Sequence, residues 1–298
     1  MNAVLPPLLL LDRLLQDWLL EDIGRGDRTT QGLFATADLA APAPVGQARW
    51  IVKEAGIVAG LPIAARVFAL LDPAMRFTAE VAEGEWCEPG QVIAEIGGRL
   101  DALLTGERVA LNLAMRLSGI ATTTHRYAAQ IADLPAQLVD TRKTTPGLRI
   151  LEKYAVQVGG ATNHRMGLDD GVMIKDNHIA AAGGIGKAIT IIRQRIPYPL
   201  TIEVETETLE QVKQALQHGA DIIMLDNMSV DQMKQAVAII RTTNERIKIE
   251  ASGNITLNTI RAVAETGVDY ISSSAPITRS TWLDLSMRIQ ADNPSERP

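Results

Sequence analysis

Five basic side chains lie within one 34-residue segment of this 298-residue chain, and they are the first candidates for chemistry. They are Arg142, Lys143, His164, Arg165 and Lys175. Arg142, Lys143 and Lys175 directly follow short apolar runs, where a positive charge is costly unless it is paired or binds an anion. Arginine suits bidentate recognition of carboxylates, and lysine acts as a point charge. We therefore expect a pocket for a multiply charged anion.

Two further cations of this region are interpreted differently. Arg149 and Lys153 follow Pro146 on a segment with a helical pattern, so we expect them to be ordinary surface charges on a helix face. Arg142, Lys143 and Lys175 differ from these two residues, because cations recur at the same place after successive apolar runs.

Acidic side chains form a second candidate group. Glu203, Glu205 and Glu207 recur at every second residue, so a strand would point all three to one face. Such like charges repel, and a lysine or a divalent cation must offset them. Asp226 ends the next apolar run, and we expect it beside Glu205. Few carboxylate ligands together with bound phosphates are typical of Mg²⁺, so Glu205 and Asp226 are the predicted metal ligands. A solvent-exposed acidic edge is the alternative, above all for Glu203 and Glu207.

Small polar residues suggest a place for phosphate. Ser252, Gly253 and Asn254 lead from an apolar run toward a helical pattern, where glycine lets the backbone approach a ligand and helix N–H groups attract phosphate. The next apolar run is followed by Ser272, Ser273 and Ser274. Taken alone, the Ser-Gly-Asn turn is more often a plain helix cap.

The elements that carry these residues form a series. Six apolar runs are anchored at Val139, Ile174, Val204, Met224, Ile249 and Ile271, with spacings of 35, 30, 20, 25 and 22 residues. Each spacing fits one strand and one returning helix, which predicts parallel strands. Helical patterns fill the gaps, for example Leu209–Leu216 and Leu257–Thr266. Because polar groups follow each run, we expect them at the carboxyl edge of a β/α barrel. An open parallel sheet would place its site at the same edge.

The first part of the chain indicates a mixed α/β domain. An amphipathic helix is predicted near the N-terminus, with an apolar stripe formed by Leu11, Leu14, Leu15, Trp18 and Leu19. Short alternating segments broken by glycine and proline follow up to residue 96, and residues 105–132 have the pattern of one or two helices.

Composition excludes several classes of protein. With 46% hydrophobic and 21% charged residues, the chain is of ordinary globular type. A net charge of −6 and eleven aromatic residues disfavour nucleic-acid binding. We expect no membrane span, because acidic and basic residues soon interrupt the leucine-rich run at the N-terminus. The single cysteine, Cys87, cannot form an internal disulfide, which fits the cytoplasm.

Several stretches together resemble quinolinate phosphoribosyltransferases, also called nicotinate-nucleotide pyrophosphorylases (carboxylating). They cover nearly the whole chain in the right order: Glu21–Thr30, Glu107–Asn112, Ser118–Thr122, Asp140–Thr144, Lys153–Val156, Asn163–Arg165, Ile174–His178, Met224–Asn227 and Leu283–Arg288. The resemblance implies an incomplete β/α barrel at residues 116–279 and an N-terminal α/β domain at residues 1–115. The C-terminal segment 280–298 is expected to return to the first domain and join it.

The resemblance also implies an activity in NAD biosynthesis. Such a phosphoribosyltransferase moves phosphoribosyl from phosphoribosyl pyrophosphate to quinolinate and releases pyrophosphate and CO₂, with Mg²⁺ as its cofactor. The implied ligands of the quinolinate carboxylates are Arg142, His164, Arg165 and, from the partner subunit of a homodimer or dimer-built oligomer, Arg108. The implied catalytic residues are Lys143, Lys175, Glu205 and Asp226. The implied ligands of the 5-phosphate are Ser252, Gly253, Asn254, Ser272, Ser273 and Ser274.

One departure from the family is visible, and two rival functions remain. Relatives often have glycine and histidine in the last phosphate loop, where this chain has Ser274 and Arg279. A related enzyme could use another pyridine carboxylate, such as nicotinate, although the number of cations favours a dicarboxylate. A non-catalytic anion-binding protein on the same fold is the other alternative, and the acidic pair Glu205 and Asp226 argues against it.

Overall fold

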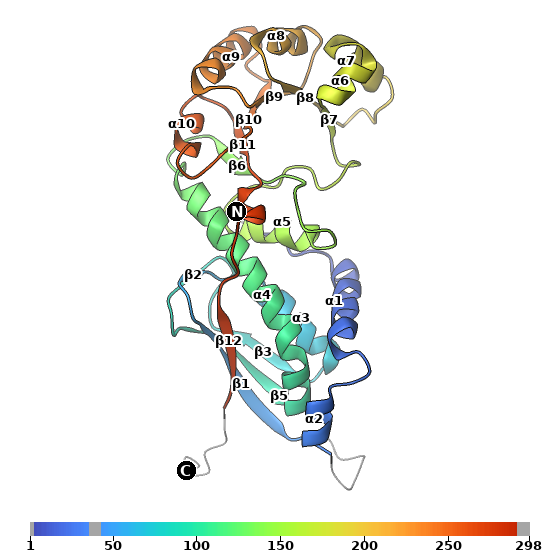
Figure 1. Cartoon of the computed structure of the whole chain (residues 1–298), viewed down its shortest axis with the longest axis vertical. Coiled ribbons are helices and arrows are strands. Elements are labelled where there is room, and N and C mark those ends of the chain that lie inside the picture. Colours follow the sequence, from blue (N-terminus) through green and yellow to red (C-terminus); the bar gives the residue numbers. More distant parts are fainter. Residues whose placement is uncertain (1–2, 36–42, 291–298) are drawn as a thin grey trace. The chain divides into compact units, whose positions relative to one another are not determined.

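The computed structural model describes residues 3–35 and 43–290 (Figure 1). The chain forms two compact units, one made by residues up to 122 together with those from 280 onward, and the other by residues 123–279. The division falls after Thr122, inside the long helix α4 (Leu100–Ala129), and the sequence analysis placed it seven residues earlier, between residues 115 and 116 of the same helix. Among the described residues, no helix combines the length and apolar character that a membrane span requires.

The first unit is built on an antiparallel sheet with the strand order β12-β1-β5-β3. These strands are β1 (Val45–Val52), β3 (Arg76–Ala79), β5 (Val92–Arg99) and β12 (Leu285–Gln290). A short pair, β2 (Gly56–Ile57) and β4 (Trp86–Cys87), lies outside this sheet. Because β12 pairs with β1, the C-terminal segment returns to the first unit as expected. This return can be followed to Gln290, and residues 291–298 lie outside the described part of the chain.

Three shorter helices complete this unit: α1 (Leu8–Ile23), α2 (Arg28–Leu33) and α3 (Leu61–Leu71). The predicted N-terminal helix is confirmed, with Leu11, Leu15 and Leu19 buried on its inner stripe. Trp50 of β1 packs edge-on against Phe68 of α3, with 6.3 Å between the ring centroids. Such burial of large apolar side chains stabilises the unit by about 1.5–3 kcal/mol per side chain.

The second unit contains a parallel sheet with the strand order β6-β11-β10-β9-β8-β7. The strands are β6 (Gln137–Val139), β7 (Val172–Ile174), β8 (Ile202–Thr206), β9 (Ile222–Asp226), β10 (Lys248–Ser252) and β11 (Tyr270–Ser272). Each predicted anchor residue lies in one of them. Because β6 and β7 are the two edges of this sheet, the barrel is incomplete, as the sequence analysis expected.

The helices between β7 and β11 lie on the outside of the curved sheet (Figure 1), and further helices follow β6 and β11. They are α5 (Arg149–Val158), α6 (Asp176–Ala182), α7 (Ile185–Arg193), α8 (Leu209–Gln217), α9 (Val230–Thr243), α10 (Ile260–Ala264) and α11 (Ala275–Thr278). Capping boxes begin α8 at Thr208 and α9 at Ser229, which defines where these helices start after the strand-end loops. The predicted helix at Leu257–Thr266 is shorter than expected, because turns occupy residues up to 259.

One glycine of α4 should contribute strongly to the stability of the first unit. A Cβ atom at Gly119 would lie 1.8 Å from the main-chain oxygen of Thr281, which cannot move without shifting the returning segment. We expect Gly119→Ala to lower the free energy of unfolding by about 2–4 kcal/mol, as overpacking against backbone does. Urea unfolding measures this change.

Gly32→Ala is the matched control, because a Cβ atom at this helical position would meet no atom within 4 Å. It should leave the stability unchanged or raise it by up to about 1 kcal/mol, since alanine is the better helix former. Equal effects of the two substitutions would contradict the contact with Thr281.

Candidate active site

A cavity of about 770 Å³ lies at the carboxyl ends of the parallel strands. This volume is within the range of small-molecule sites. It is lined by His164 and Arg165, which lie between α5 and β7, and by residues that end or follow the six strands: Arg142, Lys143, Lys175, Glu205, Asp226, Ser252, Gly253, Asn254, Ser272, Ser273 and Ser274. Thus all but one of the predicted site residues meet in one place. The exception is Arg108, which lies on α4 in the first unit with a 58% exposed side chain.

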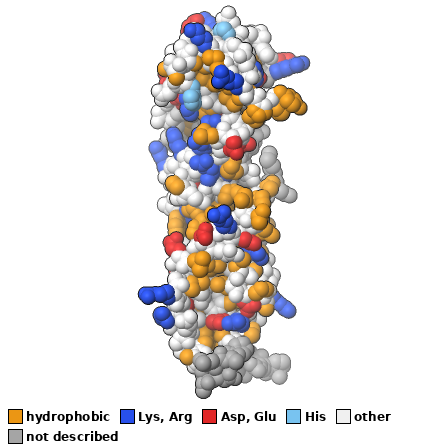
Figure 2. Space-filling model, turned by 90° about the vertical axis from the view of Figure 1, so that its right-hand side faces the viewer, with side chains coloured by type: hydrophobic (Ala, Val, Ile, Leu, Met, Phe, Trp, Pro, Cys, Tyr) orange, Lys and Arg blue, Asp and Glu red, His pale blue; other side chains and the backbone are white. Residues whose placement is uncertain are grey.

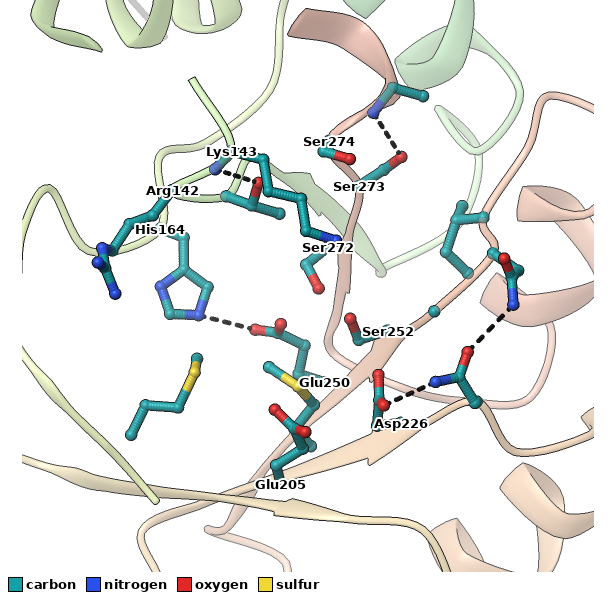
Figure 3. A pocket seen from close by; sticks show the side chains of 18 of the residues that line it. Arg142, Lys143, His164, Glu205, Asp226, Glu250, Ser252, Ser272, Ser273 and Ser274 are labelled. Carbon is teal, nitrogen blue, oxygen red and sulfur yellow. Dashed lines mark hydrogen bonds and ion pairs between the residues drawn. The ribbon is translucent and has the colours of Figure 1, made fainter. Parts of the chain in front are cut away.

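The guanidinium groups of Arg142 and Arg165 line one side of the cavity, called here the cationic wall. Figure 3 shows Arg142 on this side, beside His164. Arg165 donates from Nη1 to the main-chain oxygen of Gly171 at 2.7 Å, which orients its side chain. Burial lowers the pKa of Arg165, and the nearby charge of Arg142 lowers it further. The two arginines therefore repel each other, and the charges of Glu203 and Asp170 offset this repulsion only in part. A ligand with two carboxylates suits this wall.

Carboxylates form another part of the lining. Lys175 Nζ lies 2.6 Å from Glu205 Oε2. This lysine therefore supplies a positive charge that offsets the repulsion between the acidic side chains. Glu207 follows the end of β8 and is exposed, so it does not share the strand face with Glu203 and Glu205 as predicted. Asp226 lies at the end of the neighbouring strand β9, and Figure 3 shows it near Glu205.

The pair Glu205 and Asp226 fits a divalent cation. Burial raises the pKa of the Asp226 carboxyl group, and the charge of Glu205 raises it further, although Lys175 opposes this. Asn227 donates from Nδ2 to Asp226 Oδ2 at 2.7 Å and orients the carboxyl group. A cation bound between the two carboxylates would relieve their repulsion, and an all-oxygen donor set matches Mg²⁺.

His164 is held by two glutamates that the sequence analysis did not assign to it. Its Nε2 lies 3.2 Å from Glu203 Oε2 and 3.4 Å from Glu250 Oε2, and Figure 3 shows the ring directed toward Glu250. Burial lowers the pKa of His164, but the hydrogen bonds and charges of these glutamates outweigh burial and raise the pKa to about 10. Burial also raises the pKa of Glu203.

A main-chain contact opposes full protonation of this ring. The N–H of Arg165 donates to His164 Nδ1 at 2.7 Å, which suits a ring that carries its proton on Nε2 alone. The charged ring would lose this hydrogen bond, because both of its nitrogens then donate, while its contacts with the two carboxylates raise the pKa of His164. Although these three side chains could in principle ligate a metal ion, the proton already accounts for their contact.

The loops after β9 and β10 pack closely because of one glycine. A Cβ atom at Gly253 would lie 2.1 Å from Asn227 Oδ1, and the φ angle of +93° is itself unfavourable for other residues. Asn254 donates from Nδ2 to Asn227 Oδ1 at 3.2 Å across the same gap. The predicted helix start after this turn is wrong, because α10 begins only at Ile260.

The serine triplet begins at Ser272, the last residue of β11, and is followed at once by α11. Ser273 donates from its main-chain N–H to the oxygen of Val139, and its hydroxyl accepts from the N–H of Ala275 at 3.2 Å. Within the described residues, the hydroxyl of Ser272 is buried without a hydrogen-bond partner. Arg279, at the C-terminal end of α11, also lines the cavity. A polar ligand would satisfy both groups.

The interpretation of Lys153 as a surface charge is wrong. Its side chain is fully buried and forms an ion pair with Asp140 beneath the cavity. Arg149 is partly buried and donates to the hydroxyl of Thr144 and to the oxygen of Met166. Glu250 was missed as well, although a carboxylate inside the apolar run Ile247–Ala251 is a usable signal for a site residue.

Comparison with known proteins gives one consistent result. Residues 120–288 match the sequence family described as quinolinate phosphoribosyl transferase, C-terminal domain, and residues 27–118 match the corresponding N-terminal domain. The chain is 60% identical over 285 residues to the probable nicotinate-nucleotide pyrophosphorylase [carboxylating] of Synechocystis sp., which covers 96% of this chain and 94% of that protein. The protein of the same name from Bacillus subtilis is 45% identical, with coverage of 96% and 95%.

Solved structures agree with the sequence comparison. The crystal structure of NadC from Streptococcus pyogenes superimposes with a TM-score of 0.89 at 40% sequence identity, over 97% of this chain and 99% of that one.

The protonation of His164 should make the stability of the fold depend on pH. The ring has a pKa of 6.5 in its unperturbed state and about 10 in the fold. Its proton therefore stabilises the fold fully below pH 6.5, and this stabilisation is lost as the pH rises toward 10. We expect the stability difference between wild type and His164→Gln to be largest near pH 6 and to shrink toward pH 9.5. Urea unfolding at a series of pH values measures it.

Glu250→Gln is the matched background for this experiment. With one of the two carboxylates removed, the pH trend of the His164→Gln difference should weaken. A difference that stays constant or grows with pH would contradict the assignment.

Proposed function

The chain belongs to the quinolinate phosphoribosyltransferase family, and we propose that it transfers the phosphoribosyl group from phosphoribosyl pyrophosphate to quinolinate with loss of CO₂. The products are nicotinate mononucleotide, pyrophosphate and CO₂, which places the enzyme in NAD biosynthesis. The observation that carries this proposal is the cavity, because it combines two arginines that repel each other with a carboxylate pair at neighbouring strand ends.

Recognition of quinolinate falls to the cationic wall in this proposal. Arg142 and Arg165 bind the two carboxylates, and His164 and Lys143 add positive charge. Positive charge in a partly dehydrated cavity binds a dianion more strongly than it would in water. Bound in this way, the pyridine nitrogen is held in position for attack, which removes much of the entropic cost of bringing two substrates together.

The transfer step forms one bond and breaks another at the anomeric carbon. The bond to the pyrophosphate oxygen breaks and the electron pair leaves with pyrophosphate, while the ring nitrogen forms the new bond from the opposite face. Positive charge develops on the ribose, and the carboxylate of Glu205 stabilises it. Lys175 holds this carboxylate through the 2.6 Å contact. The two serine-containing turns bind the 5-phosphate.

Decarboxylation follows from the charge on the product ring. Once the nitrogen carries the ribose, the pyridinium ring accepts the electron pair of the breaking bond between C2 and its carboxylate. CO₂ leaves, and a proton adds to C2. This step needs no organic cofactor.

Mg²⁺ is the proposed cofactor, with Glu205 and Asp226 as its protein ligands. When bound, it would supply positive charge to the pyrophosphate group. The raised pKa of Asp226 supports a cation at this place, because the carboxyl group lacks a full counter-charge in the protein alone.

We also propose a homodimer, or an oligomer built from dimers, in the cytoplasm. Apolar side chains reach the surface (Figure 2), and on α1 the exposed fractions are 53% for Leu8, 88% for Leu9 and 67% for Leu20. Such a face is typical of a protein–protein contact. Arg108 would reach the site of the partner subunit, in keeping with its exposed side chain on α4.

Turnover with both substrates tests the function. We expect the purified protein with quinolinate, phosphoribosyl pyrophosphate and Mg²⁺ to form nicotinate mononucleotide and CO₂, measured by mass spectrometry and by release of label from the C2 carboxylate. A chelator should abolish the reaction, and added Mg²⁺ should restore it, because pyrophosphate departure requires neutralised charge.

Nicotinate in place of quinolinate is the control. It should give little product, since it offers the arginine pair only one carboxylate. Efficient turnover of nicotinate without CO₂ release would favour the rival phosphoribosyltransferase, and no turnover of either acid would contradict an enzymatic function.

Subunit complementation tests the role of Arg108. We expect Arg108→Ala and Arg142→Ala each to lower kcat/KM by about 100-fold, the cost of losing charged hydrogen bonds. If each site takes Arg142 from one subunit and Arg108 from the other, a mixed dimer of the two variants has one intact site. Random reassociation of equal amounts should restore about a quarter of wild-type activity.

The comparison sample is each variant taken through the same dissociation and reassociation alone. Mixtures no more active than these samples would mean that Arg108 serves its own subunit or serves no site.

A further inference from the structure

A buried ion pair lies beneath the cationic wall of the cavity. Asp140 directly follows β6, Lys153 lies on α5, and both side chains have 0% exposure, whereas those of Lys175 and Glu205 in the cavity have 44% and 14%. Burial raises the pKa of Asp140 and lowers that of Lys153, so burying the two charges is opposed even though they attract each other. Apolar side chains of similar size often stabilise such a place equally well or better. Stability alone therefore does not explain this pair.

The remaining hydrogen bonds of the pair go to the segment that carries His164. Asp140 Oδ1 accepts from the main-chain N–H of His164 at 2.8 Å, and Lys153 Nζ donates to the main-chain oxygen of the same residue at 3.0 Å. Asn163 Nδ2 donates to Asp140 Oδ2 at 2.7 Å and to the main-chain oxygen of Lys153 at 2.9 Å. The main-chain N–H and the main-chain oxygen of His164 are thus both hydrogen-bonded to the ion pair.

The same carboxylate joins the two segments that carry the arginines. Arg142 comes two residues after Asp140, and Arg165 directly follows His164. Main-chain pairing between these segments reaches only Thr162, which accepts from the N–H of Asp140 at 3.3 Å. Beyond Thr162, the side-chain hydrogen bonds of Asp140 and Lys153 hold the Arg142 segment and the Arg165 segment together. They do so against the mutual repulsion of the two arginines.

We propose that Asp140 and Lys153 are positioning residues for recognition of the dicarboxylate, holding Arg142 and Arg165 at the right spacing before the substrate arrives. The inference rests on the proposed function, in which that dicarboxylate is quinolinate. Preorganisation lowers the cost of binding, because the arginines need not be brought together by the ligand itself. Binding of phosphoribosyl pyrophosphate, which the proposed function assigns to the other strand ends, does not depend on this pair.

The decisive variant replaces both charges, Asp140→Asn with Lys153→Met, so that no lone charge remains buried. We expect a folded protein whose KM for quinolinate rises about 10-fold or more, while its KM for phosphoribosyl pyrophosphate stays within about twofold of wild type. If the pair had only a structural role, the two KM values would either rise together or both stay unchanged.

A second variant, Asn163→Ala, serves if the double variant does not fold. It removes two hydrogen bonds of the network and leaves both charges, so it should raise the KM for quinolinate alone, on a smaller scale.

Asp269→Asn is the matched control. Asp269 Oδ2 also accepts from an arginine, Arg241, and from a main-chain N–H, that of Ile249, both at 2.7 Å, but it lies just before β11 at the amino end of the strands. Its replacement should leave both KM values unchanged. A folded double variant with unchanged KM for quinolinate, or equal rises of both KM values, would overturn the inference.

Coupling to Arg142 is the second measurement. If the pair acts through the arginines, Arg142→Ala should cost much less in the double variant than in wild type, and full additivity would count against the inference. Calorimetric titration of quinolinate onto wild type and variants makes the same comparison without turnover. An inactive wild type that still binds quinolinate more tightly than the double variant would contradict the proposed function and leave the positioning role supported.

Discussion

The site depends on holding groups of like charge close together in the absence of a ligand. Arg142 and Arg165 share one wall, and Glu205 and Asp226 lie at neighbouring strand ends. Burial strengthens the repulsion within each pair, and neighbouring opposite charges offset it only in part. The protein accepts this cost where substrates and a cation of the opposite charge would remove it. A site already charged in this way needs little rearrangement when the ligands bind.

Rigid secondary structure makes this arrangement possible. The parallel strands bring side chains from six separate segments to one edge, and short contacts then orient them. Lys175 orients Glu205, Asn227 orients Asp226, and two glutamates orient His164. Gly253 lets two of the loops approach more closely than any larger residue would permit. Polar contacts within this unit thus orient the charged lining of the cavity.

Much of the fold and of the site could be predicted from sequence because both depend on local pattern. Each apolar anchor lies in a strand, and the residues that follow these runs line one cavity, as parallel strands require. Predictions that depended on burial were less successful. Lys153 has the sequence context of a surface residue on an amphipathic helix, yet it is buried and paired with Asp140, which directly follows β6. Glu207 follows the period of the strand but comes after its end.

The sequence by itself determined the kinds of chemistry available: cations and carboxylates in a fixed order after a series of βα units, with a resemblance that covers nearly the whole chain. Tertiary structure alone decided which of these groups face one another. The partners of His164 come from β8 and β10, and the partner of Lys153 comes from the end of β6. The physical reason is that strand and helix periods are local properties of the chain. The pairing of two buried charges instead depends on distances between segments that are remote in sequence.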